Sequence, residues 1–210
     1  AFHLCSSLPQ QAPARIIGRV AMELCAGELM QLENRDNLSL DEATYFEILE
    51  GKTASLVGAC CRLGALAVGA SPEQVAGLDR FGRRVGSAFQ VQDDVLDLTG
   101  EEAVVGKTLG RDLKKGKLTL PIIHHLGALD AERRGESLRQ LEAVSESGGD
   151  DDAHAAGILT AIRGTGSIER ATEIASRLIA EAKESLAVLP ESGARRTLDM
   201  LADAVLTRDR

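Results

Sequence analysis

The longest helix that the sequence predicts begins at Ser71 and ends near Leu98, and it limits the folds that are open to this chain. Ser71 and Gln74 have the spacing of a reciprocal N-terminal cap, and Pro72 suits the first helical position. An apolar stripe follows at helical spacing: Val75, Leu78, Phe81, Val85, Ala88 and Phe89. The helix would be about 40 Å long. No stretch of the chain alternates with the period of a strand, so we expect an all-α fold.

Three aspartates, Asp93, Asp94 and Asp97, lie in the last turns of this helix. Asp93 and Asp97 are one turn apart on the same face, where like charges repel by about 0.2–0.5 kcal/mol. Carboxylates at the C-terminal end also oppose the helix macrodipole. A divalent cation would turn this repulsion into chelation, because Mg²⁺ is held by one or two carboxylates together with phosphate oxygens and water. The alternative is a solvated acidic face without a ligand.

The segment from Gly106 to Lys117 is basic and contains three glycines. Its charged residues are Lys107, Arg111, Asp112, Lys114, Lys115 and Lys117. The whole chain has a net charge of −8 and a pI near 5.1, so this segment is a local island of positive charge. Flexible backbone and lysine side chains suit the binding of phosphate. We therefore expect a phosphate-binding segment next to the aspartates.

The composition argues against several classes of protein. An acidic chain does not suit nucleic acid as a partner, because binding the phosphate backbone needs a basic face. No stretch reaches the roughly 18 apolar residues of a membrane span. The four cysteines lack Cys-x-x-Cys spacing. We expect them to be small buried side chains in a reducing cytosol, not disulfides or zinc ligands.

The remaining pattern predicts further helices, joined by short loops. Ser39 and Glu42 have the spacing of a capping box, so we expect a helix from Ser39 that carries Tyr45 among its apolar residues and continues to Leu63. Gly51 lies in its middle, where glycine costs about 1 kcal/mol, and a glycine there relaxes the backbone or allows close approach. The other expected helices are Ala14–Glu33, Thr119–Leu129, Asp130–Ser145, and those near 153–163, 167–188 and 192–206.

The order of these motifs resembles the second aspartate-rich region of the trans-type polyprenyl diphosphate synthases. The matching residues are Phe89-Gln90, Asp93-Asp94-x-x-Asp97, and the run from Gly106-Lys107 to Gly116-Lys117-Leu118-Thr119-Leu120-Pro121. The resemblance also includes Gly27-Glu28-Leu29-Met30-Gln31, Lys52-Thr53, Gly166-Ser167-Ile168-Glu169-Arg170-Ala171 and Leu206-Thr207-Arg208. Each motif alone is weak, but their common order and spacing are specific.

The resemblance implies a bundle of mostly antiparallel helices around a central cavity, in a single all-helical domain over residues 1–210. It implies a cytoplasmic, homodimeric enzyme that uses Mg²⁺ to join isopentenyl diphosphate to an allylic diphosphate by ionisation, condensation and elimination. Asp93, Asp94 and Asp97 would then bind Mg²⁺. The allylic diphosphate would be bound, and its developing charge stabilised, by Lys52, Gln90, Lys107 and Lys117, with Thr53 beside them.

One departure from the family's pattern concerns the start of the chain. The family has a first aspartate-rich motif, followed by two arginines, upstream of the second motif. Nothing of this kind occurs before Gly18. We therefore expect that roughly the N-terminal third of the family's domain is absent and that the chain as given is catalytically incomplete.

Two other functions remain open at this point. The chain could be a non-catalytic helical subunit that binds isoprenyl diphosphate or stabilises a partner synthase, or a helical scaffold in which the acidic turn has no ligand. The presence of both the lysines and the aspartates favours the enzyme, because a purely structural subunit does not need all of them. These residues do not specify the product chain length, the allylic primer or the oligomeric state.

Overall fold

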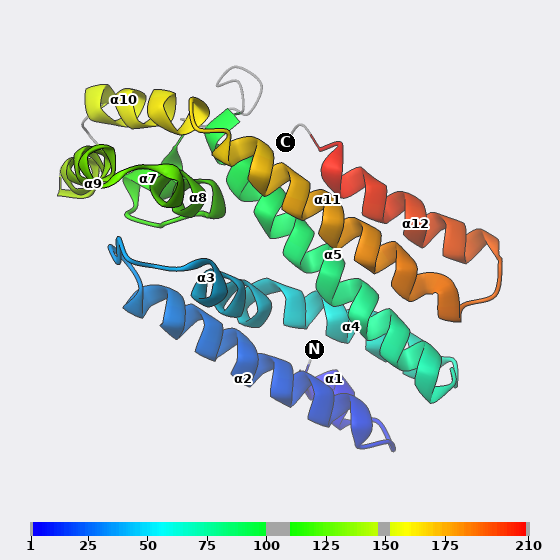
Figure 1. Ribbon diagram of the computed structural model, residues 1–210. Coiled ribbons are helices and arrows are strands. Elements are labelled where there is room, and N and C mark those ends of the chain that lie inside the picture. Colours follow the sequence, from blue (N-terminus) through cyan, green and yellow to red (C-terminus); the bar gives the residue numbers. More distant parts are fainter. Residues whose placement is uncertain (1, 100–109, 147–151, 209–210) are drawn as a thin grey trace. The chain divides into compact units, whose positions relative to one another are not determined.

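The computed structural model describes residues 2–99, 110–146 and 152–208, and the secondary structure within these ranges is helical (Figure 1). This confirms the prediction of an all-α fold. In chain order the α-helices are α1 (Phe2–Ser6), α2 (Ala12–Glu33), α3 (Glu42–Leu49), α4 (Ser55–Ala67), α5 (Pro72–Thr99), α7 (Arg111–Lys114), α8 (Leu120–Ala128), α9 (Ala131–Glu146), α10 (Asp152–Arg163), α11 (Ser167–Ser185) and α12 (Gly193–Leu206). A π-helical turn, η1 (Glu50–Ala54), joins α3 to α4, and a 3₁₀ turn, η2 (Leu186–Val188), follows α11.

The chain divides into two compact units, each built from segments that are distant in sequence. The first unit comprises residues 1–31, 46–90 and 176–207, and the second comprises 32–45, 91–175 and 208–210. Helices α2, α3, α5 and α11 each continue from one unit into the other. A single domain over residues 1–210 stays a prediction.

In the first unit, glycines allow α4 and α5 to approach closely. A Cβ atom on Gly82 would lie 2.6 Å from the carbonyl oxygen of Val57, and one on Gly86 would lie 3.2 Å from Cγ2 of Val57 and 2.9 Å from the Cα atom of Ala54, the last residue of η1. Such distances leave no room for a side chain at either glycine. The absence of side chains at Gly82 and Gly86 therefore sets the spacing between these two helices.

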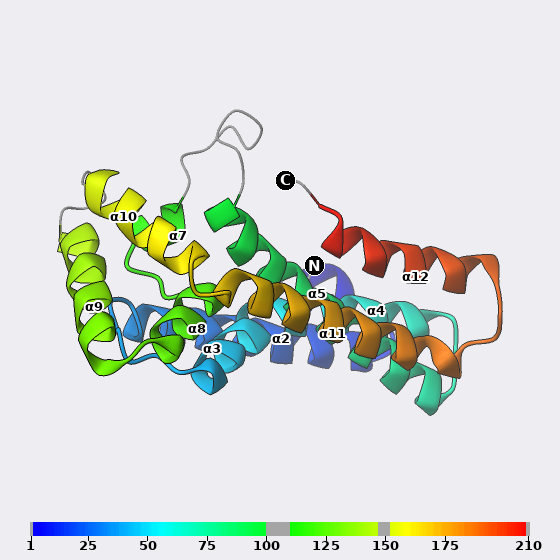
Figure 2. The same cartoon turned by 45° about the horizontal axis from the view of Figure 1, so that its top comes forward.

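Ion pairs join the other helices of the first unit. Arg84 on α5 pairs with Glu181 on α11 at 2.9 Å. Lys183 on α11 pairs with Asp199 and Asp203 on α12, at 3.2 and 2.8 Å. In Figures 1 and 2, α12 accordingly lies alongside the C-terminal part of α11.

The expected start of α3 at Ser39 is wrong, because the helix begins at Glu42. Asp41 provides the cap: its Oδ1 accepts a hydrogen bond from the backbone N–H of Thr44 at 2.8 Å. The backbone N–H of Ser39 instead donates to the side chain of Asn37 at 3.0 Å. Ser39 therefore belongs to the turn before the helix, where aspartate and asparagine side chains compete with serine for the cap.

The turn η1 interrupts the helix that the sequence predicted to run through Gly51. It faces α2 at two glycines: a Cβ atom on Gly27 would lie 2.6 Å from the backbone nitrogen of Lys52, and one on Gly51 would lie 3.1 Å from the carbonyl oxygen of Glu23. Of the two roles predicted for Gly51, a relaxed backbone or close approach, these contacts show the close approach. Single π turns inside helices often occur at functional sites.

Helix α5 begins as the sequence predicted. The backbone N–H of Ser71 donates to Oε1 of Gln74 at 3.1 Å, and the backbone N–H of Gln74 donates to the hydroxyl of Ser71 at 3.2 Å. This is the reciprocal capping box. At the other end of α5, the guanidinium of Arg163 donates to the carbonyl oxygen of Leu98 at 3.0 Å, which satisfies a carbonyl that the helix leaves open.

The second unit has an apolar core between the last turns of α5 and helices α8, α9 and α10. Its fully buried side chains include Leu98, Leu120, Ile122, Val144, Ile158 and Ile162. His125 of α8 is buried beside them, and its two ring nitrogens lie 3.1 Å from the hydroxyls of Thr165 and Ser137. Burial lowers the pKa of His125, which favours the neutral ring at this position.

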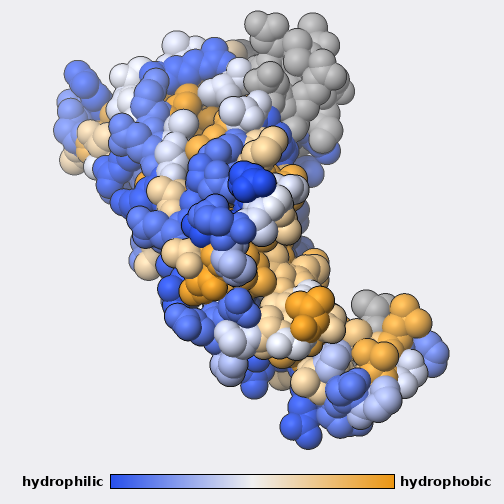
Figure 3. Space-filling view, turned by 90° about the vertical axis from the view of Figure 1, so that its right-hand side faces the viewer, coloured by the Kyte–Doolittle hydropathy of each residue, from blue (hydrophilic) through white to orange (hydrophobic). Residues whose placement is uncertain are grey.

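Several large apolar side chains reach the surface of the first unit, among them Met22 and Leu29 on α2 and Met200 and Leu201 on α12. Figure 3 shows apolar patches between hydrophilic side chains on one face of the molecule. The four cysteines are free, but Cys25 and Cys60 are exposed, which corrects the expectation that all four are buried. Within the described ranges, no helix combines the length and the hydropathy needed to cross a membrane.

Candidate functional site

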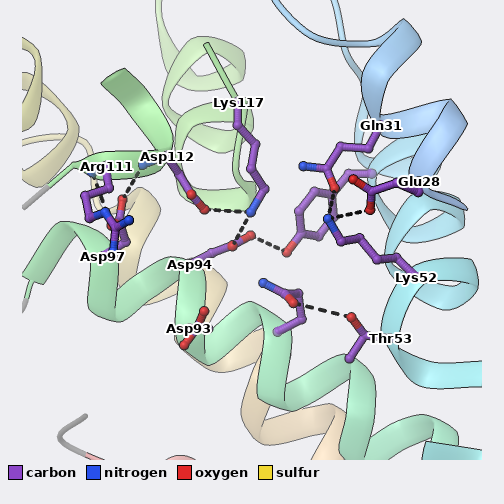
Figure 4. A network of polar contacts seen from close by, with 12 residues as sticks. Glu28, Gln31, Lys52, Thr53, Asp93, Asp94, Asp97, Arg111, Asp112 and Lys117 are labelled. Carbon is purple, nitrogen blue, oxygen red and sulfur yellow. Dashed lines mark hydrogen bonds and ion pairs between the residues drawn. The ribbon is translucent and has the colours of Figure 1, made fainter. Parts of the chain in front are cut away.

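In the second unit, the carboxylate of Asp94 is the centre of a polar cluster at the end of α5 (Figure 4). Its side chain is completely buried. The hydroxyl of Tyr45 donates to Oδ2 of Asp94 at 2.7 Å, and Nζ of Lys117 donates to Oδ1 at 3.1 Å. Burial raises the pKa of Asp94, although the charge of Lys117 and the hydrogen bond from Tyr45 act in the opposite direction. These two donors stabilise a carboxylate that the interior would otherwise disfavour.

Lys117 has a second carboxylate partner, Asp112, whose Oδ2 lies 2.6 Å from Nζ. Burial alone would lower the pKa of Lys117, but the charges of Asp94 and Asp112 outweigh it and raise that pKa well above the usual lysine range. The ammonium is therefore charged at neutral pH and is held from two sides. Figure 4 shows Lys117 reaching between these two carboxylates.

The backbone that carries Lys117 is fixed at Gly116. Gly116 has a φ of 68°, in the left-handed region that favours glycine, and a Cβ atom there would overlap the carboxylate of Asp36. The backbone N–H of Asp36 donates to the carbonyl oxygen of Gly116 at 3.1 Å, and the hydroxyl of Ser145 donates to Oδ1 of Asp36 at 2.6 Å. The loop before α3 and the end of α9 thus hold this turn together.

Asp97 binds backbone groups. Its two carboxylate oxygens accept hydrogen bonds from the backbone N–H groups of Arg111 and Asp112, at 3.2 and 3.1 Å, and its carbonyl oxygen accepts one from Gly110 at 2.8 Å. Burial raises the pKa of Asp97, and the hydrogen bond from Asp112 lowers it in part. A carboxylate that accepts the first N–H groups of α7 acts as its N-terminal cap, so Asp97 ties the basic segment to α5.

Asp93 differs from both of its neighbours because its side chain is 53% exposed. Its Oδ1 pairs with the guanidinium of Arg208 at 3.0 Å. Figure 4 shows Asp93 on a different side of α5 from Asp94. Of the three aspartates, Asp93 therefore presents its carboxylate to solvent, whereas Asp94 is enclosed by Tyr45 and Lys117.

No group of three or more metal-binding side chains is found in the part of the chain that the structure describes. The donor chemistry of Asp93 nevertheless fits a hard cation such as Mg²⁺, which is commonly held by one or two carboxylates and completed by phosphate oxygens and water. Asp94 and Asp97 are already engaged by the donors described above. Metal binding by Asp93, Asp94 and Asp97 stays a prediction.

The first unit contains a second polar cluster around Lys52, on the π turn η1. Nζ of Lys52 donates to Oε1 of Gln31 at 2.6 Å and pairs with Oε2 of Glu28 at 2.9 Å (Figure 4). The side chains of Lys52 and Glu28 are 38% and 52% exposed. The next residue, Thr53, donates its hydroxyl to Oε1 of Gln90 on α5 at 3.4 Å. Two motifs that the sequence singled out separately, around Glu28 and around Lys52, are thus in contact.

The sequence-predicted residues fall in three groups. Lys52, Thr53 and Gln90 lie in the first unit, and Asp93, Asp94, Asp97 and Lys117 lie in the second. Lys107 lies outside the described residues.

Sequence reasoning missed three partners of these residues: Tyr45, Asp112 and Arg208. Tyr45 was assigned only to an apolar stripe. A tyrosine on a buried helix face usually finds a hydrogen-bond partner for its hydroxyl, and that signal could have pointed to it.

These observations define an all-α protein in which an aspartate-bearing helix end contacts a basic, glycine-containing turn. The family model described as polyprenyl synthetase matches residues 1–157. The chain therefore belongs to the polyprenyl synthetase family, as its resemblance indicated.

Individual proteins of known name or structure are similar over nearly the whole chain. A short chain isoprenyl diphosphate synthase from Methanothermobacter thermautotrophicus is 34% identical over 204 residues, which are 97% of this chain and 61% of that protein. The crystal structure of a decaprenyl diphosphate synthase from Rhodobacter capsulatus is 32% identical, with a TM-score of 0.89 over 100% of this chain and 63% of that one.

A polyprenyl synthase from Caulobacter crescentus, crystallised with calcium and isoprenyl diphosphate, is 29% identical, with a TM-score of 0.90 over 100% of this chain and 62% of that one. The chain thus spans about three fifths of the length of each of these proteins.

Proposed function

We propose that the protein carrying this chain is a trans-prenyltransferase that condenses isopentenyl diphosphate with an allylic diphosphate to give a longer polyprenyl diphosphate, in a reaction that depends on Mg²⁺. The observation that carries the proposal is the contact between the aspartate-bearing end of α5 and Lys117 of the basic segment. Membership of the polyprenyl synthetase family and the names of the similar proteins support it.

In this reaction the lysines bind the allylic diphosphate and stabilise the negative charge that develops on it as it leaves. A positioned ammonium acts most strongly where water is partly excluded, and the side chain of Lys117 is only 26% exposed. We assign the same role to Lys52, Thr53, Gln90 and Lys107. Each of them binds phosphate oxygen in the proposal.

The aspartates have different parts in the proposal. Asp93 binds Mg²⁺ together with diphosphate, because it is the exposed carboxylate of the three. Asp94 and Asp97 complete the acidic set, and their described contacts also hold Lys117 and α7 in place. When bound, Mg²⁺ supplies Lewis-acid stabilisation of the departing diphosphate.

The proposal also includes a homodimer and a cytoplasmic location. Met22 and Leu29 lie seven residues apart on α2, hence on one face of that helix, and both are exposed. Large exposed apolar side chains often mark interaction surfaces. Sedimentation analysis should give a dimer for the native protein, and Leu29→Lys should shift it toward monomer; a native monomer would contradict this part.

The test of the function is condensation of labelled isopentenyl diphosphate with geranyl or farnesyl diphosphate by the protein that carries these 210 residues, with Mg²⁺ present. We expect products that are longer by isoprene units, and their loss on chelation of the metal and in Asp93→Ala. Binding of allylic diphosphate without any product would instead favour the non-catalytic subunit. Failure to bind allylic diphosphate at all would refute both the enzyme and a subunit that binds isoprenyl diphosphate.

A further inference from the structure

Tyr45 is the only tyrosine in the chain. It is 5% exposed and donates its hydroxyl to Oδ2 of Asp94 at 2.7 Å. Asp94 lies 49 residues further along the sequence and has no exposed side-chain surface. A hydrogen bond from a buried phenol to a buried carboxylate fixes the orientation of both side chains, because neither group can replace this partner with water.

The hydrogen bond from Tyr45 also determines where the other carboxylate oxygen of Asp94 lies. With Oδ2 engaged by Tyr45, Oδ1 faces Lys117 at 3.1 Å. Without the phenol, the carboxylate could turn and draw the ammonium toward both of its oxygens. Tyr45 thus fixes the orientation of the group that holds Lys117.

Lys117 has three N–H donors and a limited set of partners. Two donors are used on Asp94 and Asp112, and the described residues provide no other partner for Nζ. Asp112 is itself fixed, because its backbone N–H donates to Asp97 at 3.1 Å. Toward the described residues, the ammonium is therefore held on two sides and keeps one donor open to a ligand.

We propose that Tyr45 is a positioning residue, which acts through Asp94 to hold the open N–H of Lys117 toward an oxygen of a bound diphosphate. This inference rests on the proposed role of Lys117 in binding diphosphate. A purely structural role for Tyr45 would instead affect the stability of the fold without any specific dependence on Lys117.

A double-mutant cycle separates these two roles. The probe is inorganic pyrophosphate in buffer containing Mg²⁺, and its affinity is measured by calorimetry for the native chain, Tyr45→Phe, Lys117→Met and the double variant. Tyr45→Phe should weaken binding about five- to tenfold in the native background, the scale of one ordinary hydrogen bond. In the Lys117→Met background the same substitution should change the affinity by less than about twofold.

Ser137→Ala is the matched control, because it also removes a buried hydroxyl from a hydrogen bond in the second unit, to His125. It should lower the stability and leave pyrophosphate affinity unchanged. Equal effects of Tyr45→Phe in both backgrounds would overturn the inference. So would a native chain that does not bind pyrophosphate.

The emission of Tyr45 gives a second readout, because the chain has no other tyrosine and no tryptophan. Pyrophosphate should change this emission in the native chain, since a ligand on Lys117 alters the charge around Asp94. It should not do so in Lys117→Met. An unchanged emission in a native chain that binds pyrophosphate would also overturn the inference.

The condensation assay remains independent of this cycle. If the protein shows the coupling but forms no product, the positioning role of Tyr45 stands and the proposed function is refuted. If it forms product without the coupling, the proposed function stands and the positioning role is refuted.

Discussion

Lys52 and Lys117 are both proposed to bind diphosphate, but the protein holds them in different ways. Lys52 pairs with Glu28, whose side chain is 52% exposed, so water screens the pair. Such pairs contribute about 0–1 kcal/mol to stability. Lys117 pairs with Asp94, whose side chain is not exposed at all, and breaking a buried pair typically costs about 3–5 kcal/mol. An exposed lysine can exchange its partner for a ligand at little cost, whereas a buried one also supports the fold.

The largest effect that distinguishes the two regions should come from Asp94→Ala. It removes the buried carboxylate and leaves the ammonium of Lys117 and the phenol of Tyr45 without that partner. We expect the free energy of unfolding, measured with denaturant, to fall by about 3–5 kcal/mol. The exposed neighbour Asp93 is the control, and Asp93→Ala should change the free energy of unfolding by less than about 1 kcal/mol. Similar losses in the two variants would contradict the contrast between buried and exposed carboxylates.

The next effect concerns ligand binding at Lys52. Lys52→Ala should weaken the binding of an allylic diphosphate by about 1.5–3 kcal/mol, the scale of a charge-assisted hydrogen bond. Its cost in stability should stay below about 1 kcal/mol, because the pair with Glu28 is exposed. Calorimetry measures the diphosphate affinity, and denaturant unfolding of the same preparation measures the stability. Unchanged diphosphate affinity would remove Lys52 from the proposed site.

A smaller effect is expected where the backbone of Lys52 contacts α2. Gly27→Ala would place a Cβ atom 2.6 Å from the backbone nitrogen of Lys52, and we expect a destabilisation of about 1–3 kcal/mol. Gly64→Ala in α4 is the matched control, since no atom lies within 4 Å of its added Cβ. That variant should be stabilised by up to about 1 kcal/mol. Thermal unfolding gives both values, and a neutral Gly27→Ala would mean that η1 can move away from α2.

The smallest effect is a shift in titration. Burial, and then the charge of Asp94, raises the pKa of Tyr45 well above its ordinary value of 10.0. The folded pKa lies above the unfolded one, so the stabilisation is complete below pH 10.0 and is lost as the pH rises through the folded value. Near-ultraviolet absorbance should therefore show no phenolate at pH 10.0 in the native chain, and Asp94→Asn should lower the pKa. A normal titration would place Tyr45 outside the buried cluster.

The sequence was sufficient for the elements whose signals are local. The capping box at Ser71 and Gln74 was confirmed, because both partners lie within one helical turn. At Ser39 the same reasoning was wrong, since Asp41 offers a competing cap two residues later. Periodicity located the helix through Gly51, but it could not foresee the π turn, which lies against Gly27 of α2.

The candidate site was predictable in its residue types but not in its pairing. Asp93, Asp94 and Asp97 form one motif in the sequence, yet one is exposed, one is buried against Tyr45 and one caps α7. Burial and long-range partners decide these differences, and neither is encoded in spacing along the chain. Asp112 was overlooked because a single acid in a basic segment carries no local signal, although it bonds Lys117 more closely than Asp94 does.

The π turn η1 has a consequence for the rotational register of the helix that carries Lys52. A π turn accommodates one residue more than the regular α-helical repeat, and each residue of an α-helix advances its side chain by about 100°. Deleting a single residue from Glu50–Ala54 would let α3 and α4 join as one continuous α-helix, with no loss of helical hydrogen bonding. The side chains of α3 and α4 would keep their rotational register, because the π turn absorbs the extra residue, and only the side chains within the turn, among them Lys52 and Thr53, would change direction. A length change that looks harmless to the helix would therefore separate Lys52 from Gln31 or Thr53 from Gln90.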